Sequence, residues 1–411
     1  MVRSNRSTPI ALLVSVTAAA AAMAPEAGAA ADDAALASEV RALLDRHFHD
    51  PDRLERLDGV PDNPGAMLDA LDASHTARYT PDETAYYELL DIYAPAIEDD
   101  VERLFGPEGV SYVGLEMVTQ RIDGREFIAE IRAGGPADEA GLRVGDEVLE
   151  ADGRPFHPVR SFEGRAGKPV TLTIRRRGDD ERRDEEDIRP VMRQVTPRVI
   201  HPQRSLLRAM RDSVKVLESG GHSVGYVRVY SYAGREAHET LGKLLTIGPL
   251  RDADALILDL RGGWGGASPE YALSFVDRAP KLTLIDRDGE EHVIRNEDTA
   301  PSWQWDRPLA VLIDHGSRSG KEVLAHVFRA EGVPLIGTRT AGAVLGGRPF
   351  VLSDDSLRLI AVMDVRVDGV RLESRGVEPT KEVPFDPRYA DGDDPPFDAA
   401  IQQITESIDA P

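Results

Sequence analysis

Three patterns of apolar and polar positions follow one another along the chain. Between residues 33 and 105, apolar residues recur at helical spacing, as in ALASEVRALLDRHF, which predicts a small helical region. Between residues 111 and 196, short alternating runs bounded by Gly, Pro or Asp predict a compact β-rich module. From residue 224 onward, apolar runs such as DALILDL and LAVLID alternate with helical patterns. That order predicts α/β layering with partly parallel strands, so the fold class expected is multidomain α/β.

The N-terminus has the pattern of a secretory signal. Arg3 and Arg6 precede the apolar run ALLVSVTAAAAAMA, and a small-x-small cleavage site ends near Ala29. The apolar run is shorter than a membrane-spanning helix requires. We therefore expect residues 1–29 to be a signal peptide and the mature chain to have no membrane span. Export to the periplasm or the extracellular space follows.

Composition narrows the classes of partner. The 411 residues, 41% of them hydrophobic, are enough to bury a core. A net charge of −23 repels nucleic acid and anionic lipid surfaces, which argues against both as partners. The chain has no cysteine, so a disulfide, a thiolate site and a lipoprotein anchor are excluded. No pattern in the sequence indicates an oligomeric state.

The stretch LAVLIDHGSRSGKEVLAHVFRAEG places Ser319 where a buried strand feeds a helix. A serine there lies beside the free N–H groups of the helix start, a geometry that suits an activated serine and equally an ordinary helix N-cap. Gly316 and Gly320 enclose only three residues, so the stretch is not a phosphate-binding loop. No HExxH or paired-cysteine pattern occurs, and we expect neither a metal nor an organic cofactor.

A second junction carries a glycine turn. In ALILDLRGGWGGASPE a buried strand ends at Arg261, and the glycines that follow let backbone N–H groups approach a substrate carbonyl. Such turns are common between strands and helices. This one lacks the full spacing of a dinucleotide-binding fingerprint.

The β-rich module resembles a PDZ domain. The resemblance rests on YVGL and on GPADEAGLRVGDEVLEADG, which is close to the short helix and following strand of the PDZ domains of secreted bacterial proteases. It implies that a loop formed by Tyr112, Val113, Gly114 and Leu115 binds the carboxylate of a polypeptide C-terminus. An adjacent strand edge would accept the rest of the peptide. A spacer domain that binds nothing is the alternative.

Most of the mature chain resembles one enzyme family. ADALILDLRGGWGG, the Ser319 stretch through GTRTAGAVLGG, and LESRGVEPTKEVPF are similar to the carboxy-terminal processing, or tail-specific, proteases. These are serine peptidases with a crotonase-like α/β core, a helical N-terminal part and an inserted PDZ domain. The resemblance implies an N-terminal helical region at 30–105, a PDZ domain at 106–196 and a protease core at 197–411.

The resemblance also implies roles for individual residues. Ser319, three residues before a glutamate, matches the family's nucleophile. The amides of Gly320 and Gly265 would form the oxyanion hole. In a tricorn-like branch of the family, a glutamate shortly before the GVxPD-like ending takes part in catalysis, and here Glu373 in LESRGVEPT occupies that position.

The general base is where the sequence departs from the family. Ala343 stands where well-known members have a lysine, and Arg228 stands in the position that we assign to the histidine of the tricorn-like branch. An arginine stays protonated and cannot act as a base. Lys321 is included among the catalytic candidates because a positive helix end would lower its pKa, although on a regular helix it lies nearly opposite Ser319. The histidines weighed against it are His75, His238, His315 and His326, of which His75 is read as a structural residue. The sequence alone does not identify the base.

Two functions from different classes follow. The first is an exported serine endopeptidase whose PDZ domain holds the C-terminus of a polypeptide substrate while Ser319 attacks a peptide bond. The second is a catalytically silent peptide-binding or scaffolding protein on the same fold. Ala343 and Arg228 favour the second function, whereas Ser319, the glycine turn and Glu373 favour the first.

Overall fold

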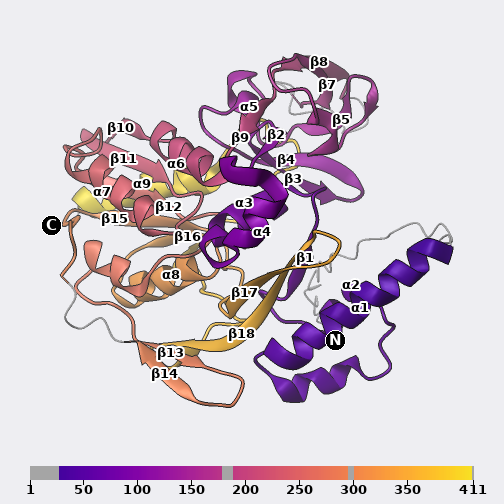
Figure 1. The fold of residues 1–411 in the computed structure, drawn as a ribbon. Helices are drawn as coiled ribbons and strands as arrows, with labels where there is room; N and C mark the ends of the chain where they lie inside the picture. Colours follow the sequence, from indigo (N-terminus) through magenta and orange to yellow (C-terminus); the bar gives the residue numbers. More distant parts are fainter. Residues whose placement is uncertain (1–26, 178–187, 295–299, 410–411) are drawn as a thin grey trace, which may run out of the picture.

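The computed structural model describes residues 27–177, 188–294 and 300–409 (Figure 1). All but the last three residues of the expected signal segment lie outside this part of the chain. Within it, no helix combines the length and apolar character needed to cross a bilayer. The chain forms mixed helices and sheets in several packed units, as the apolar pattern predicts.

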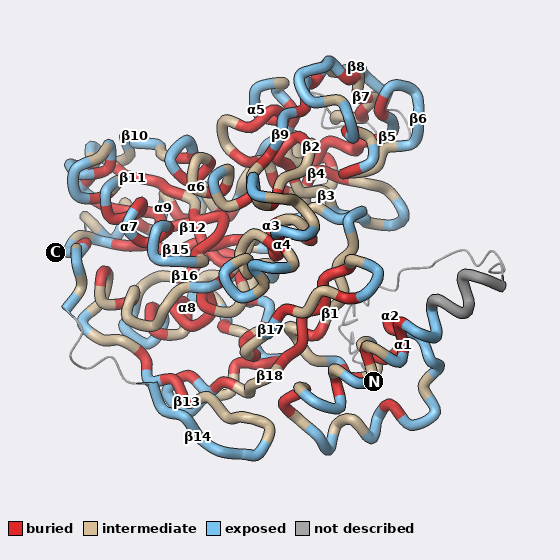
Figure 2. The backbone as a smooth tube through the Cα atoms, in the orientation of Figure 1, coloured by how far each residue is buried: buried red, intermediate tan, exposed pale blue. Residues whose placement is uncertain are grey.

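A six-stranded sheet forms the centre of the C-terminal α/β region, which is the core of the molecule. Its order is β10-β11-β12-β15-β16-β20, and every neighbouring pair from β11 onward is parallel. All residues of β12 and β15 are buried (Figure 2), as expected of central parallel strands covered on both faces. The strands are β10 (Lys215–Ser219), β11 (His222–Arg228), β12 (Ala255–Asp259), β15 (Leu309–Ile313), β16 (Leu335–Gly337) and β20 (Lys381–Glu382).

Helices cover both faces of this sheet. Leu256 and Leu258 of β12 pack in one cluster with α7 and α8, whereas Ala255 and Ile257 pack in another with α9. Because successive strand residues point to opposite faces, one apolar strand serves two hydrophobic layers. The helices of the core are α6 (Pro202–Asp212), α7 (Arg235–Thr246), α8 (Gly320–Ala330), α9 (Pro395–Asp409) and the 3₁₀ helix η6 (Pro269–Ser274).

A second sheet joins the N-terminal region to the core. Its order is β1-β18-β13-β14, with β17 and β19 also paired to β18. Its strands are β1 (Ala77–Tyr79), β13 (Leu282–Ile285), β14 (Glu291–Ile294), β17 (Gly346–Val351), β18 (Leu357–Val367) and β19 (Val370–Arg371). The first two helices pack with β18 in one cluster, and the next two pack with Leu357 in another. These helices are α1 (Ala27–His47), α2 (Pro64–Leu71), α3 (Thr84–Tyr93) and α4 (Glu98–Phe105).

The PDZ domain is a separate sheet of order β3-β4-β5-β7-β8, with β6 paired to β5. A two-stranded pair, β2 with β9, stands at its base. Its elements are β2 (Tyr112–Gly114), β3 (Met117–Ile122), β4 (Arg125–Ile131), α5 (Pro136–Glu139), β5 (Glu147–Ala151), β6 (Arg154–Pro155), β7 (Val170–Arg175), β8 (Pro190–Val195) and β9 (Arg198–Ile200).

The C-terminal segment before α9 ties the PDZ domain to the core. The amide of Tyr389 donates to the Gly145 carbonyl at 3.1 Å, and its hydroxyl donates to Glu147 at 2.6 Å. On the opposite side of β4, Glu130 forms an ion pair with Arg228 of β11. These contacts hold β3 and β4 against the carboxyl ends of the core strands, where the glycine turn lies.

Candidate active site

Ser319 lies at the junction between β15 and α8, as the sequence predicts. Asp314, directly after β15, accepts hydrogen bonds from the amides of Gly262, Gly316 and Ser317 at 2.9 to 3.0 Å, which ties this loop to the glycine turn. Ser319 itself has φ 55° and ψ −126°, a left-handed backbone conformation that costs a non-glycine residue free energy. The surrounding hydrogen bonds hold the residue in this strained conformation.

The backbone around Ser319 is fixed by one buried carboxylate. Glu322 accepts hydrogen bonds from the amides of Ser319, Gly342 and Ala343 at 3.2, 2.7 and 2.8 Å. The Ser319 amide also donates to the Ala343 carbonyl at 2.8 Å. Burial raises the pKa of Glu322, although each of these hydrogen bonds opposes that rise. Ala343, at the position of the family's lysine, therefore contacts the serine through its backbone.

A cavity of about 270 Å³ opens beside Ser319. It brings together residues from the N-terminal helical region, the glycine turn and the Ser319 loop. Its wall is mainly apolar and aromatic, apart from the polar residues close to the serine. The lining residues are Ser74, His75, Tyr79, Leu89, Ile92, Tyr93, Ala233, Trp264, Gly265, Gly266, Arg318, Ser319, Ala343 and Leu359.

A chain of three polar side chains ends in this cavity. The Ser74 hydroxyl donates to Glu373 Oε2 at 2.7 Å and lies 3.1 Å from His75 Nδ1. Glu373 is buried and also accepts from the amides of Ser74 at 3.0 Å and Val344 at 2.9 Å. The Ser74 hydroxyl has one proton, which it donates to Glu373. Ser74 Oγ must therefore be the acceptor in its hydrogen bond with His75, and Nδ1 of His75 carries the proton. The other ring nitrogen, Nε2, then carries the free lone pair.

His75 is held in a neutral, strained state. Burial lowers its pKa to about 4, although Glu373 pulls in the opposite direction. Its backbone φ is 54°, and Ser374, next to Glu373, has φ 61°. Left-handed backbone at non-glycine residues concentrates at functional sites. The sequence analysis read His75 as a structural residue; the structure places it in the cavity of Ser319 and links it through Ser74 to Glu373.

The two glycines expected to form an oxyanion hole lie against each other. A Cβ atom built on Gly265 would stand 2.9 Å from the Gly320 nitrogen and 2.6 Å from Ser319 Cβ, so only glycine fits there. Gly320 packs as closely on Ala267, where a Cβ would lie 2.4 Å from its nitrogen. Within the described part of the chain, neither amide donates a hydrogen bond. Two unpaired N–H groups thus stand beside the serine.

Lys321 points away from the serine. Its ammonium donates to the Gly262 carbonyl at 2.7 Å and to the Tyr230 carbonyl at 3.5 Å. Burial lowers its pKa to about 7, partly offset by the charge of Glu130. A buried amine in hydrogen bonds with two carbonyls braces the glycine turn, and this orientation does not favour Lys321 as the base.

Arg228, which stands at the histidine position of the tricorn-like branch, and the histidines His238 and His326 lie elsewhere. Arg228 is ion-paired with Glu130, and His238 is stacked on Tyr271 with ring centroids 3.9 Å apart. His326 lies 3.6 Å from a carboxylate oxygen of Asp368. None of these three lines the cavity of Ser319.

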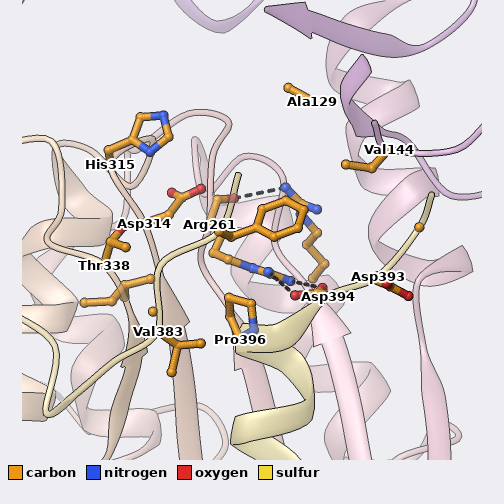
Figure 3. Close-up of a pocket in the computed structure, with 15 residues that line it drawn as sticks. Ala129, Val144, Arg261, Asp314, His315, Thr338, Val383, Asp393, Asp394 and Pro396 are labelled. Atoms are coloured by element: carbon orange, nitrogen blue, oxygen red, sulfur yellow. Dashed lines mark hydrogen bonds and ion pairs between the residues drawn. The ribbon is translucent and has the colours of Figure 1, made fainter. Parts of the chain in front are cut away.

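His315 lines a different cavity, at the carboxyl ends of the parallel strands (Figure 3). There the Arg261 guanidinium pairs with Asp394 at 2.7 and 2.8 Å and also with the buried Asp259. Arg261 and Asp394, which both line this cavity, are thus paired with each other, and Ser319 is not among its lining residues. The ion pairs of Arg261 with Asp394 and Asp259 stabilise the start of the glycine turn.

The predicted carboxylate-binding loop lies at the base of the PDZ sheet. Tyr112 stacks on Tyr87 of α3 with ring centroids 4.8 Å apart, and Leu115 is buried in the PDZ core with Val113 packed against it. A Cβ atom added to Gly114 would lie 2.7 Å from the Tyr112 ring, so a larger residue does not fit at this position. The strand that follows, β3, stands at the edge of the PDZ sheet.

A second cavity, of about 410 Å³, connects this strand edge to the glycine turn. Val118, Thr119 and Gln120 of β3 line one side, and Trp264 and Arg318 line the other. An extended polypeptide paired to β3 would therefore lead toward Ser319. Among the described residues, no group of three or more His, Cys, Asp or Glu side chains is arranged to hold a metal ion.

Comparison with known proteins identifies the family. The model of peptidase family S41 matches residues 223–383, and a PDZ domain model matches residues 127–176. Residues 223–383 therefore form a peptidase family S41 domain. The match includes Ser319, Gly265 and Glu373, whereas Ser74 and His75 lie outside both models.

Curated relatives of this S41 chain are processing proteases. It is 25% identical over 324 residues to the carboxyl-terminal-processing protease of Picosynechococcus sp., covering 73% of each chain. It is 25% identical over 300 residues to the carboxy-terminal processing protease CtpB of Bacillus subtilis, covering 70% of this chain and 57% of that protein. For the Synechocystis sp. protease the values are 27% over 286 residues, with 65% and 64% covered. The chain thus spans between 57% and 73% of the length of these relatives.

Solved structures support the fold. The photosystem II D1 C-terminal processing protease superposes with a TM-score of 0.50 at 19% identity, covering 91% of this chain and 97% of that one. A putative S41 protease from Bacteroides fragilis superposes with a TM-score of 0.51 at 16% identity, covering 90% and 95%. The S41 chain therefore has the multidomain α/β fold of a C-terminal processing protease, and its family is one of serine-type peptidases.

Proposed function

We propose that this chain is an exported serine endopeptidase in which Ser319 is the nucleophile and His75 is the general base. The observation that carries the proposal is the hydrogen-bonded chain from Glu373 through Ser74 to His75, which ends in the cavity of Ser319. A nucleophile, a neutral imidazole and a group that orients it are the parts that acyl transfer by a serine requires.

The reaction follows from this arrangement. Nε2 of His75 accepts the Ser319 hydroxyl proton while Oγ attacks the peptide carbonyl, and the amides of Gly265 and Gly320 stabilise the oxyanion. The imidazolium then gives its proton to the leaving amine, and water hydrolyses the acyl-enzyme by the same steps. The Ser74 hydroxyl, polarised by its hydrogen bond to Glu373, accepts from Nδ1–H of His75. This interaction, together with the nearby charge of Glu373, stabilises the imidazolium as it forms. Lys321 braces the glycine turn from behind.

Substrate binding and location complete the proposal. Polypeptide C-termini bind at the Tyr112–Leu115 loop and pair with the edge of β3, from which the second cavity leads to Ser319. Export rests on the charged and apolar pattern of the first 29 residues. The scaffold alternative rested on a missing base, and His75 supplies one.

A fluorophosphonate probe tests the nucleophile directly. The probe forms a covalent bond with a serine activated by a neighbouring base, so we expect mass mapping of the intact chain to find the adduct on Ser319. The S319A variant should stay unlabelled and should not cleave an unfolded protein that has an apolar C-terminal tail. Labelling of another serine, or none, together with unchanged binding of the tail, would favour the scaffold function.

The pH dependence of kcat/KM distinguishes the two base candidates. A base must be unprotonated, so His75, with a pKa of about 4, should support cleavage throughout the range above it. We expect kcat/KM to rise through about pH 4 and to level off by about pH 5 to 6. An acid limb near pH 7 would instead match Lys321. Intrinsic fluorescence at each pH checks that the fold persists.

A further inference from the structure

Arg318 directly precedes the proposed nucleophile. It lines both the Ser319 cavity and the second cavity, which connects β3 to the glycine turn. Its guanidinium lies over the Trp264 ring, 5.5 Å from the ring centroid. Its Nε atom is buried and has no hydrogen-bond partner among the described residues. Within that part of the chain, no carboxylate is ion-paired with it.

The acids near Arg318 are engaged by other groups. Glu373 binds Ser74 and the Val344 amide. Glu88 accepts from Arg132 at 3.1 Å and from Trp264 Nε1 at 2.5 Å. The charge of Glu88 is thus balanced by Arg132, and Glu88 is not paired with Arg318.

The other acidic side chains that line the second cavity also have hydrogen-bond or ion-pair partners. Glu130 is paired with Arg132 and Arg228, and Asp314 holds three backbone amides. In a chain with 72 acidic against 49 basic residues, an arginine beside the serine without an acidic partner leaves a local positive site. A guanidinium offers two parallel N–H donors that match a carboxylate.

We propose that Arg318 binds a carboxylate of the peptide substrate close to the scissile bond. The inference rests on the proposed function and specifies its substrate class: polypeptides with a carboxylate within about two or three residues of the cut, a reach set by the rise of about 3.4 Å per residue of an extended chain. The carboxylate belongs to an aspartate or glutamate side chain, or to the C-terminus of a short substrate that does not reach the Tyr112–Leu115 loop.

The geometry gives the carboxylate a place on the substrate path. A chain that runs from the β3 edge to Ser319 passes between the two cavities, and Arg318 lines both of them. The guanidinium lies over the Trp264 ring, and this contact with the ring face uses none of its N–H donors. The apolar wall of the Ser319 cavity excludes competing water and strengthens the ion pair.

Cleavage-site profiling tests the inference. The full chain is incubated with a peptide mixture prepared from an unrelated proteome, and the cuts are mapped by mass spectrometry. We expect Asp, Glu or a free C-terminus to be enriched near the cuts, and the enrichment to disappear in R318Q. Synthetic pairs, Glu against Gln and free acid against amide, then identify the source of the carboxylate. The kcat/KM ratio within the preferred pair should fall about ten- to a hundredfold in R318Q.

Two further variants sharpen the test. R318K keeps the positive charge but loses the bidentate N–H donor pair of the guanidinium. Its kcat/KM ratio within the preferred peptide pair should therefore lie between those of wild type and R318Q. R56Q removes the same charge from an exposed arginine of the 3₁₀ helix Pro51–Leu57 and should leave the ratio unchanged. Equal enrichment in wild type and R318Q would overturn the inference while leaving the peptidase proposal standing.

Binding separates this inference from the peptidase proposal. The S319A variant is titrated with a free-acid peptide and its amide, and tryptophan fluorescence reports on Trp264. A preference for the acid that disappears in S319A/R318Q supports the carboxylate site even if the wild-type chain cuts nothing. Equal affinity for acid and amide, and for Glu and Gln peptides, in S319A overturns it.

Discussion

Replacing His75 with glutamine is expected to lower kcat/KM by about a thousandfold. Glutamine keeps the approximate size of the side chain but cannot take a proton from Ser319, and a positioned base contributes about 10² to 10⁴ in rate. The variant should also lose labelling by the fluorophosphonate probe. Steady-state cleavage of a quenched fluorescent peptide by wild type and H75Q measures the effect.

The control for this prediction is H326Q. His326 lies on α8 against Asp368, outside the Ser319 cavity, so its replacement should leave kcat/KM within about twofold of wild type. If H75Q kept wild-type activity, His75 could not be the base, and the role would pass to Lys321. The acid limb of the pH profile would then have to lie near pH 7.

Replacing Asp259 with asparagine is expected to destabilise the core by about 3 to 5 kcal/mol, the usual cost of breaking a buried ion pair. Asp259 is fully buried, pairs with Arg261 at 2.7 Å and accepts from the Tyr226 hydroxyl at 2.8 Å. Burial alone would raise its pKa, but Arg261 and Arg228 outweigh burial and hold the pKa below the usual range. Urea denaturation followed by tryptophan fluorescence measures the loss as a lower transition midpoint.

Asp394 supplies the matched comparison. It pairs with the same Arg261 guanidinium, but about a third of its side chain is exposed, so water screens the pair. D394N should therefore cost about 1 kcal/mol or less. Equal shifts of the midpoint in D259N and D394N would contradict the view that burial decides the cost.

Local patterns in the sequence were enough to find Ser319. The apolar run of β15, the short polar loop and the stripe of α8 are contiguous, and each is set by its own residues. The glycine turn after β12 was found for the same reason. The S41 and PDZ resemblance was confirmed because it rests on such contiguous motifs.

The place of His75 in the Ser319 cavity was not predicted, because Glu373, which completes its hydrogen-bonded chain, is distant in sequence. Ser74 and Glu373 are separated by 299 positions, and nothing in ASHTARY distinguishes a base from a structural histidine. The available signal was the order of the chain: a Ser-His pair stands just before β1, a strand that pairs with β18 of the second sheet. The sheet around β18 was not predicted either, because its eleven residues LRLIAVMDVRV mix apolar and charged positions without a clean alternation.

The proposed site is assembled from both ends of the chain. Ser74 and His75 are made early in synthesis, whereas Glu373 emerges from the ribosome only after most of the core. A nascent chain therefore holds its serine without the complete group that activates it. On the proposed mechanism, cleavage of neighbouring polypeptides, including other copies of the chain, waits until the molecule is nearly finished, so the order of translation itself limits premature activity.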